Sequence, residues 1–154
     1  MTSAYRAAAF AAAAVFGAAF LAVPNARAEG GDLYRQHCSV CHQAGGAGLA
    51  GVYPRLAGRA PKIAAAPAGR RMMAAAVLNG MAGRLEVDGK PLMGVMPGFP
   101  QLSDQDLAEV LSYVASLGGK PAKPFAPAEV AAVRAAGRMS PTQTNALARA
   151  VNVE

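Results

Sequence analysis

The sequence predicts an all-α fold, a small domain in which short helices alternate with loops. Strand signals are scarce, because β-branched residues are few and no stretch of six residues alternates between apolar and polar side chains. Helical signals are clearer, and the strongest covers Ser103 to Leu117, where apolar residues recur at spacings of three and four. Segments rich in Gly and Pro, residues 45–61 and 88–100, separate the helical patterns and are expected to form loops.

Residues 1–28 have the layout of a secretory signal peptide. Tyr5-Arg6 supplies a positive region, an apolar run from Ala7 to Val23 ends at Pro24, and Ala26-Arg27-Ala28 forms an A-x-A cleavage site. We therefore expect export and a mature chain that begins at Glu29. The alternative is an uncleaved membrane anchor, but the run is short and rich in Ala for a bilayer span. No later stretch is apolar enough to cross a membrane, so the mature protein is not expected to span one.

The mature chain divides into a compact domain, a linker and an extension. The domain is expected over residues 29–117. Residues 118–124 form the linker, whose glycines end a helix and whose prolines resist starting another. Residues 125–154 form a C-terminal extension with a short helical pattern at 127–134. We weigh two roles for it, a stabilising or disordered addition and a surface that docks with a parent enzyme.

Three segments of the domain carry signals for helix ends. Asp32 is expected to cap a first helix that contains Tyr34 and Cys38. A second helix is expected from Arg70 to Asn79, closed by Gly80. The last helix begins at Ser103, which forms a capping-box pattern with Asp106 three residues later.

The charge of the chain is weakly positive. The net charge is +6, and the signal peptide holds two of the positive charges and no acid, so the mature chain carries +4. This charge is too small and too dispersed to indicate a nucleic-acid-binding protein. A mildly basic face for an acidic protein partner is compatible with it.

The motif Cys38-Ser39-Val40-Cys41-His42 predicts covalent attachment of one haem c. Two thiols separated by two residues can add to the two vinyl groups of one porphyrin. The imidazole of His42 then reaches the iron from one face of the ring. A small domain with much loop also needs a large apolar centre, and a haem would supply it.

Other interpretations of the motif fit less well. An exported protein could oxidise the two cysteines to a disulfide, and a thioredoxin-like redox pair also uses CxxC. The redox pair is expected next to a βαβ unit, which the sequence does not predict. A zinc site would have only His37, Cys38, Cys41 and His42, which fall within six residues and are too close in sequence for a tetrahedral cage. A chance match in an inert exported protein is the remaining alternative.

The second axial position of the iron can hold histidine, methionine or no protein ligand. His37 lies beside Cys38 and cannot easily reach the opposite face of the ring. Met93 and Met96 lie in a Gly- and Pro-rich segment just before the last helix, whereas Met72, Met73 and Met81 lie in or near a helical pattern and fit the core. Both methionines, and an open site, stay candidates at this point.

The chain resembles class I c-type cytochromes of the small bacterial mono-haem type over about residues 30–117. The segment from Met96 to Asp104, MPGFPQLSD, is similar to the M-P-x-F…L-S-D segment of that family, and Met96 matches its ligand. Gly30 and Tyr34 resemble a G-x-x-x-[FY] pattern in which the small residue lets the last helix cross closely. Tyr113 resembles the aromatic residue of that last helix.

The resemblance implies further roles near the haem. Tyr53 to Gly58 is similar to the P-x-L-x-G loop, in which the carbonyl of Pro54 would bind the ring N–H of His42. Arg55 and Arg59 are either partners of the haem propionates or solvated surface arginines. The implied fold is a cytochrome c-like helical domain wrapped around one covalently bound haem.

The expected function is single-electron transfer in the periplasm between a redox protein donor and an acceptor. Ligation by His42 and Met96 leaves no open iron position, and no acid–base pair or nucleophile is evident elsewhere, so the protein is not expected to be an enzyme. Two alternatives remain. One is the haem subunit of an exported oxidoreductase complex, and the other is a sensor or gas-binding protein with an open iron site.

Overall fold

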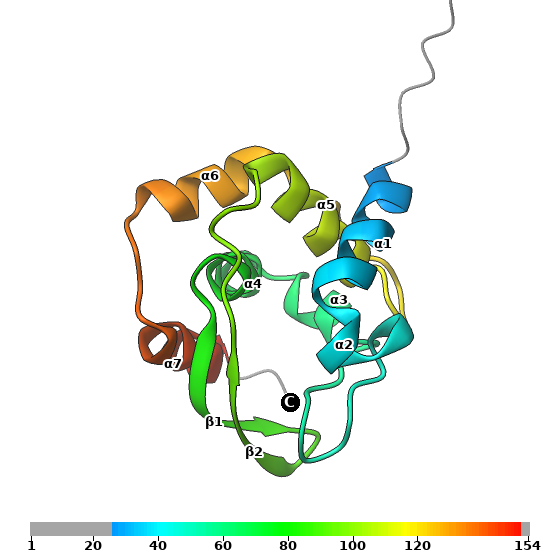
Figure 1. The fold of residues 1–154 in the computed structure, drawn as a ribbon, viewed down its shortest axis with the longest axis vertical. Coiled ribbons are helices and arrows are strands. Elements are labelled where there is room, and N and C mark those ends of the chain that lie inside the picture. Colours follow the sequence, from blue (N-terminus) through cyan, green and yellow to red (C-terminus); the bar gives the residue numbers. More distant parts are fainter. Residues whose placement is uncertain (1–25, 152–154) are drawn as a thin grey trace, which may run out of the picture.

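The computed structural model describes residues 26–151, and their side chains from Glu29 onward (Figure 1). The predicted signal peptide, residues 1–28, lies outside the described residues except for the backbone of residues 26–28, where the first helix begins. The elements in chain order are α1 (Ala26–His37), α2 (Ser39–His42), the 3-10 turn η1 (Ala44–Gly46), α3 (Ala60–Ile63), α4 (Pro67–Asn79), β1 (Met81–Val87), β2 (Lys90–Met96), α5 (Asp104–Val114), α6 (Pro127–Ala135) and α7 (Pro141–Val151).

Helices α1 and α5 cross at a close contact between Gly30 and Glu109. A Cβ atom on Gly30 would lie 2.3 Å from the carbonyl oxygen of Glu109, so only glycine fits this crossing. One turn further along, the rings of Tyr34 and Tyr113 pack with their centroids 5.3 Å apart. The close crossing expected at Gly30 and the aromatic packing expected at Tyr34 and Tyr113 are therefore confirmed.

Two of the three helix ends predicted from the sequence are found in the structure. Helix α5 begins after Ser103, which forms the expected capping box with Asp106. Helix α4 ends at Asn79 and is followed by Gly80, as predicted, but it begins earlier, at Pro67. The prediction for Asp32 was wrong: this residue lies inside α1, where its carboxylate pairs with Arg35 instead of capping the helix.

The largest departure from the all-α prediction is an antiparallel hairpin formed by β1 and β2. Its turn and β2 lie within residues 88–100, which were expected to form a loop, and β1 lies just before them. Its turn is Asp88-Gly89, and both residues have positive φ angles, 52° and 70°. Asp-Gly is the residue pair that a two-residue hairpin turn favours. The strand alternation is hidden in the sequence because Gly83 and Gly94, which are partners in the hairpin register, carry no side chain that could mark either face.

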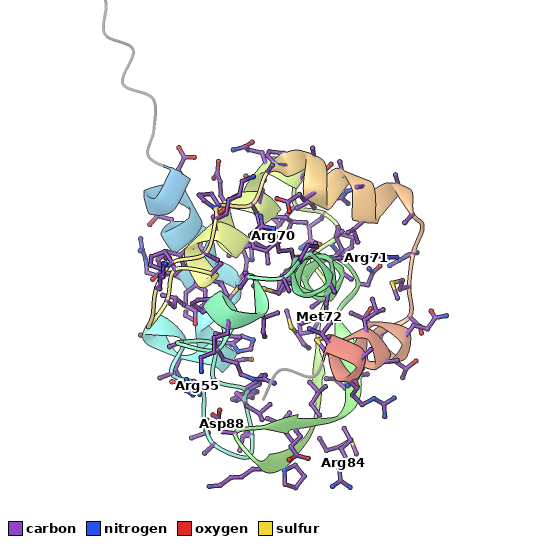
Figure 2. The ribbon with its side chains drawn as sticks, turned by 180° about the vertical axis from the view of Figure 1, so that it is seen from behind. Arg55, Arg70, Arg71, Met72, Arg84 and Asp88 are labelled. Atoms are coloured by element: carbon purple, nitrogen blue, oxygen red, sulfur yellow. The ribbon has the colours of Figure 1, made fainter. Side chains whose placement is uncertain are left out.

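The C-terminal extension folds back onto the domain as α6 and α7 (Figure 1). Helix α6 packs on α4 and α5, and α7 packs on α4 and β1. Val130 of α6 and Thr144 of α7 are fully buried. Arg70 of α4 makes a bidentate ion pair with Glu129 and stacks on the ring of Phe125, so it anchors the start of the extension (Figure 2).

The main core lies between α1, α4, α5 and α6, with Tyr34, Leu107 and Leu111 among its fully buried side chains. Apart from the hairpin, the named secondary-structure elements of residues 26–151 are helices joined by loops, which confirms the all-α fold class. Within residues 26–151, none of the helices combines the length and the apolar character that crossing a bilayer requires.

Candidate functional site

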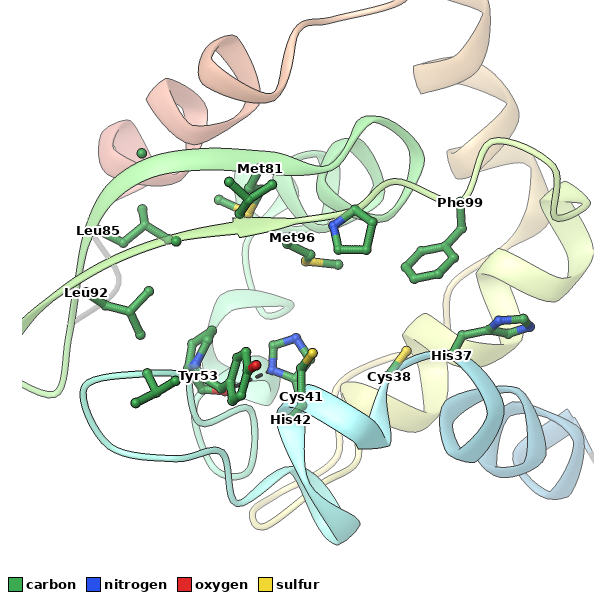
Figure 3. Close-up of a pocket in the computed structure, with 16 residues that line it drawn as sticks. His37, Cys38, Cys41, His42, Tyr53, Met81, Leu85, Leu92, Met96 and Phe99 are labelled. Atoms are coloured by element: carbon green, nitrogen blue, oxygen red, sulfur yellow. Dashed lines mark hydrogen bonds between the residues drawn. The ribbon is translucent and has the colours of Figure 1, made fainter.

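The CSVCH motif lies where α1 passes into α2, at one wall of a pocket (Figure 3). The amides of Cys41 and His42 both donate to the carbonyl of Cys38, which winds the motif into a single helical turn. Figure 3 shows the sulfur atoms of Cys38 and Cys41 and the ring of His42 directed into the same space. Both cysteines are free thiols. The disulfide considered from the sequence is therefore not formed in this structure.

His42 is buried and held in one orientation by a backbone carbonyl. Its Nδ1 lies 2.9 Å from the oxygen of Pro54, the contact that the sequence led us to expect. Because a carbonyl can only accept, Nδ1 donates and the lone pair of the neutral ring is on Nε2. Burial lowers the pKa of His42, against a smaller opposing effect of the Pro54 contact. The imidazole is therefore neutral, with a lone pair available to a metal ion.

The thiol of Cys38 is held in its neutral form. Burial, and secondarily the nearby Cys41, raise the pKa of Cys38 to about 11.

The hydroxyl of Tyr34 in α1 donates to the carbonyl of Gln43, 2.7 Å away, and so connects α1 to the turn that follows the motif. This contact fixes the motif relative to the helix crossing at Gly30.

Two methionines, Met81 and Met96, lie on the wall of the pocket opposite His42 (Figure 3). They are partners in the register of the hairpin, at the first residue of β1 and the last residue of β2. Met93 is 72% exposed and is not part of the pocket lining. The structure therefore does not support Met93 as an axial ligand, and it identifies Met81 as a competitor to Met96 that the sequence analysis had assigned to the core.

The main chain just after Met96 is pressed against the end of α4. The amide of Phe99 donates to the carbonyl of Val77, 2.7 Å away. Gly80 and Gly98 meet without side chains, and a Cβ atom on Gly80 would lie 2.5 Å from the carbonyl oxygen of Met96. The pocket wall that carries Met96 is therefore fixed by backbone contacts to a helix.

The pocket encloses about 760 Å³, part of it open to solvent. Its lining is mostly apolar, with Leu85, Leu92 and Phe99 among the side chains (Figure 3). Gly83 and Gly94 contribute backbone without side chains, which lets a flat molecule approach the hairpin. The pocket therefore brings together two thiols, the imidazole of His42 and the thioether sulfur of a methionine in a mostly apolar lining. This combination fits a covalently attached haem.

His37 also borders the pocket, and its ring packs against Phe99 with the centroids 5.6 Å apart. It sits at the end of α1 beside Cys38, on the same side of the pocket as the motif (Figure 3). This placement agrees with the inference that His37 does not reach the face of the ring opposite His42.

Arg55 connects the loop that holds His42 to the tip of the hairpin. Its guanidinium donates to both carboxylate oxygens of Asp88, at 3.0 and 2.7 Å, and to the carbonyl of Ala57 (Figure 2). The bidentate bond to Arg55 lowers the pKa of Asp88. Arg59 donates to the carbonyl of Glu86 in β1, 3.4 Å away. Both arginines therefore contact the hairpin, a role that was not expected from the sequence.

Several residues of the pocket were not identified from the sequence. They include Tyr53, Met81, Leu85 and Leu92. The signal that could have found the last three is the Asp88-Gly89 turn, because it predicts a hairpin and so places 81, 85 and 92 on one face. Tyr53 precedes Pro54 in a loop without periodicity, and no local pattern assigns it to the pocket.

Comparison with known proteins agrees with the resemblance to c-type cytochromes. Residues 27–118 match the family model described as "Cytochrome c". One cytochrome c-552 of Thermus thermophilus is 39% identical over 123 residues, which cover 77% of this chain and 82% of that protein. A second cytochrome c-552, also from Thermus thermophilus, is 38% identical over 122 residues, or 76% of this chain and 92% of that protein.

Proposed function

Because the chain belongs to the cytochrome c family, whose members bind haem c and transfer electrons, we propose that it carries single electrons between redox proteins in the periplasm. The observation that carries the proposal is the pocket itself. Cys38, Cys41 and His42 line one wall, and Met96 lies across from them. We propose residues 29–117 as the haem-binding domain, 118–124 as its linker and 125–154 as its extension.

We propose that each of these residues has a separate role. The thiols of Cys38 and Cys41 would hold the haem as two thioethers, and Nε2 of His42 would bind the iron while Pro54 orients the ring. The sulfur of Met96 would bind the iron from the pocket wall across from His42. The bound haem supplies a one-electron couple at its iron. A His/Met ligand pair raises the potential of that couple relative to bis-histidine ligation.

Two exposed apolar residues, one in the attachment motif and one in the pocket lining, support contact with a protein partner. Val40 lies between Ser39 and Cys41 in the attachment motif and is 84% exposed, and Val95 is 77% exposed and borders the pocket from β2. Electron transfer requires a partner to approach the pocket, and exposed apolar side chains support such contacts. Periplasmic location rests on the signal peptide expected at residues 1–28.

The ligand assignment is tested by the visible spectrum of the oxidised holoprotein. We expect a Met–iron charge-transfer band that is lost in Met96→Ala and retained in Met81→Ala and Met93→Ala. Loss of the band in Met81→Ala with retention in Met96→Ala would reassign the ligand. Rapid CO binding by the ferrous protein as isolated would instead indicate an open iron site, as in a sensor or gas-binding protein.

The cellular role needs two further measurements. Fractionation of the native host is expected to place the haem protein in the periplasm, with Glu29 as its first residue by N-terminal sequencing. A chain that purifies alone and titrates with one electron supports a free carrier. A stable stoichiometric partner supports the alternative, the haem subunit of an oxidoreductase complex.

A further inference from the structure

Arg134, in the last turn of α6, bonds the segment that follows Met96. Its Nη1 donates to the carbonyl of Pro100 and its Nη2 to the carbonyl of Leu102, each at 2.9 Å. Its Nε donates to a carboxylate oxygen of Asp104, the first residue of α5, at 2.8 Å. All three guanidinium nitrogens are therefore bonded to the stretch 100–104, in a geometry that suits the planar fork of arginine.

The segment between Met96 and α5, which includes the two carbonyls bound by Arg134, has little regular secondary structure. Residues 97–102 form neither helix nor strand, and Pro100 and Gln101 are exposed. On one side the stretch meets the end of α4 through Gly98 and through the bond from the Phe99 amide to Val77. On the other side it meets Arg134. The route from Met96 to α5 is thus held between a helix of the domain and a side chain of the extension.

Arg134 itself is held by a well-anchored helix. Val130 on α6 is fully buried, and Glu129 forms its ion pair with Arg70 of α4. After α6, the amide of Met139 donates to the side-chain oxygen of Asn79, 3.2 Å away, at the end of α4. The side chain of Arg134 is 37% exposed and that of Asp104 is 30% exposed, so the contact is partly shielded from solvent.

We propose that Arg134 is a positioning residue for Met96: it holds closed the loop that carries the axial sulfur. The inference rests on the proposed function, in which Met96 is the iron ligand. Without Arg134 the stretch 97–102 opens more often, and Met96 leaves its position for a larger fraction of the time. The apparent affinity of a small ligand for that position rises in proportion to the open fraction.

The first test is a titration of the oxidised full-length holoprotein with imidazole. We expect Arg134→Ala to bind imidazole about tenfold more tightly than the wild type. Arg134→Lys keeps the charge next to Asp104 but cannot reach both carbonyls, so its affinity is expected to be closer to that of Arg134→Ala. The control is Arg149→Ala on α7, where an exposed arginine makes no hydrogen bond or ion pair within residues 29–151, and wild-type affinity is expected.

The second test separates loop opening from general loss of stability. Amide hydrogen exchange of the Arg134→Ala holoprotein is expected to accelerate in peptides covering 97–103 and to stay at the wild-type rate in α1 and in the second half of α5. Unchanged exchange at 97–103, or equal acceleration in α1, would overturn the proposal. Imidazole affinity that does not change in Arg134→Ala would also overturn it.

A different result would show that Met96 is not the iron ligand. Met96→Ala is expected to bind imidazole more tightly than any Arg134 variant, because the competing sulfur is gone. If Met96→Ala bound imidazole no more tightly than the wild type, Met96 would not be the ligand and the proposed function would need revision. The exchange result for residues 97–103 measures the contact of Arg134 with the loop and does not depend on that outcome.

Discussion

Gly98 and Gly80 touch through their backbones at the point where the chain leaves Met96. A Cβ atom on Gly98 would lie 2.8 Å from the backbone nitrogen of Gly80 and 2.7 Å from the carbonyl oxygen of Leu78. These are backbone atoms at the end of α4, which cannot move aside as a flexible side chain can. The contact fixes the distance between that helix and the segment that presents Met96 to the pocket.

The first prediction concerns this contact. Gly98→Ala is expected to destabilise the protein by about 1–3 kcal/mol, because the added methyl group must displace backbone. It should also weaken the Met–iron charge-transfer band, since the main chain next to Met96 shifts. Denaturant unfolding and the visible spectrum measure the two effects. Gly119→Ala is the matched control, because its Cβ would meet no atom closer than 3.8 Å, and equal unfolding midpoints for the two variants would contradict the prediction.

The second prediction concerns the crossing of α1 and α5. In an isolated helix Ala is more favourable than Gly by about 1 kcal/mol, so Gly30→Ala would stabilise α1 if space allowed. The clash with the carbonyl of Glu109 reverses the sign, and we expect a loss of about 2 kcal/mol in the free energy of unfolding. At Gly31 a Cβ would lie 3.3 Å from the ring of Tyr113, which can shift. A Gly31→Ala variant as unstable as Gly30→Ala would argue against this account.

The third prediction concerns the hairpin turn. Gly89 has a φ of +70°, and a Cβ there would meet nothing within 4 Å, so Gly89→Ala introduces backbone strain alone. We expect it to cost about 1–2 kcal/mol. Asp88→Asn removes the ion pair with Arg55 but keeps a residue that tolerates positive φ, and this exposed pair contributes little. The midpoint temperature of thermal unfolding should therefore be near the wild-type value for Asp88→Asn and clearly lower for Gly89→Ala. The reverse order would refute the turn assignment.

The fourth prediction concerns pH and the anchor of the extension. The bidentate bond from Arg70 lowers the pKa of Glu129 to about 2 from an ordinary value of 4.5. A lowered pKa in the folded state stabilises the protein above pH 4.5, and this contribution is lost as the pH falls from 4.5 toward 2. Because Glu129 is 38% exposed, we expect the contribution to be about 1 kcal/mol after screening.

The variant Glu129→Gln tests this expectation. It should be less stable than the wild type at pH 7, and the difference should shrink as the pH falls from about 4.5 toward 2. Urea unfolding across that pH range measures it. A difference that stays constant with pH would show that the carboxylate charge of Glu129 does not stabilise the extension.

Features that depend on neighbouring residues could be predicted from the amino-acid sequence of this protein. Helix α5 was predictable because its capping residues and its apolar face lie within one segment, and the contact of Pro54 with His42 followed from a family loop pattern. The cysteine pair and the adjacent histidine needed no tertiary information either, because the attachment chemistry depends on their spacing along the chain. The cap expected at Asp32 failed because helix α1 begins upstream of it.

The side chains that face the haem pocket from the wall opposite His42 could not be predicted in this way, because their orientation depends on tertiary contacts. Met81, Met93 and Met96 are the same residue type within sixteen positions, and the register of the hairpin turns two of them inward and leaves Met93 exposed. Register depends on pairing between strands that Gly83 and Gly94 make hard to recognise. The role of Arg134 likewise depends on a fold-back of α6 that joins residues more than thirty positions apart, a contact that no local pattern encodes.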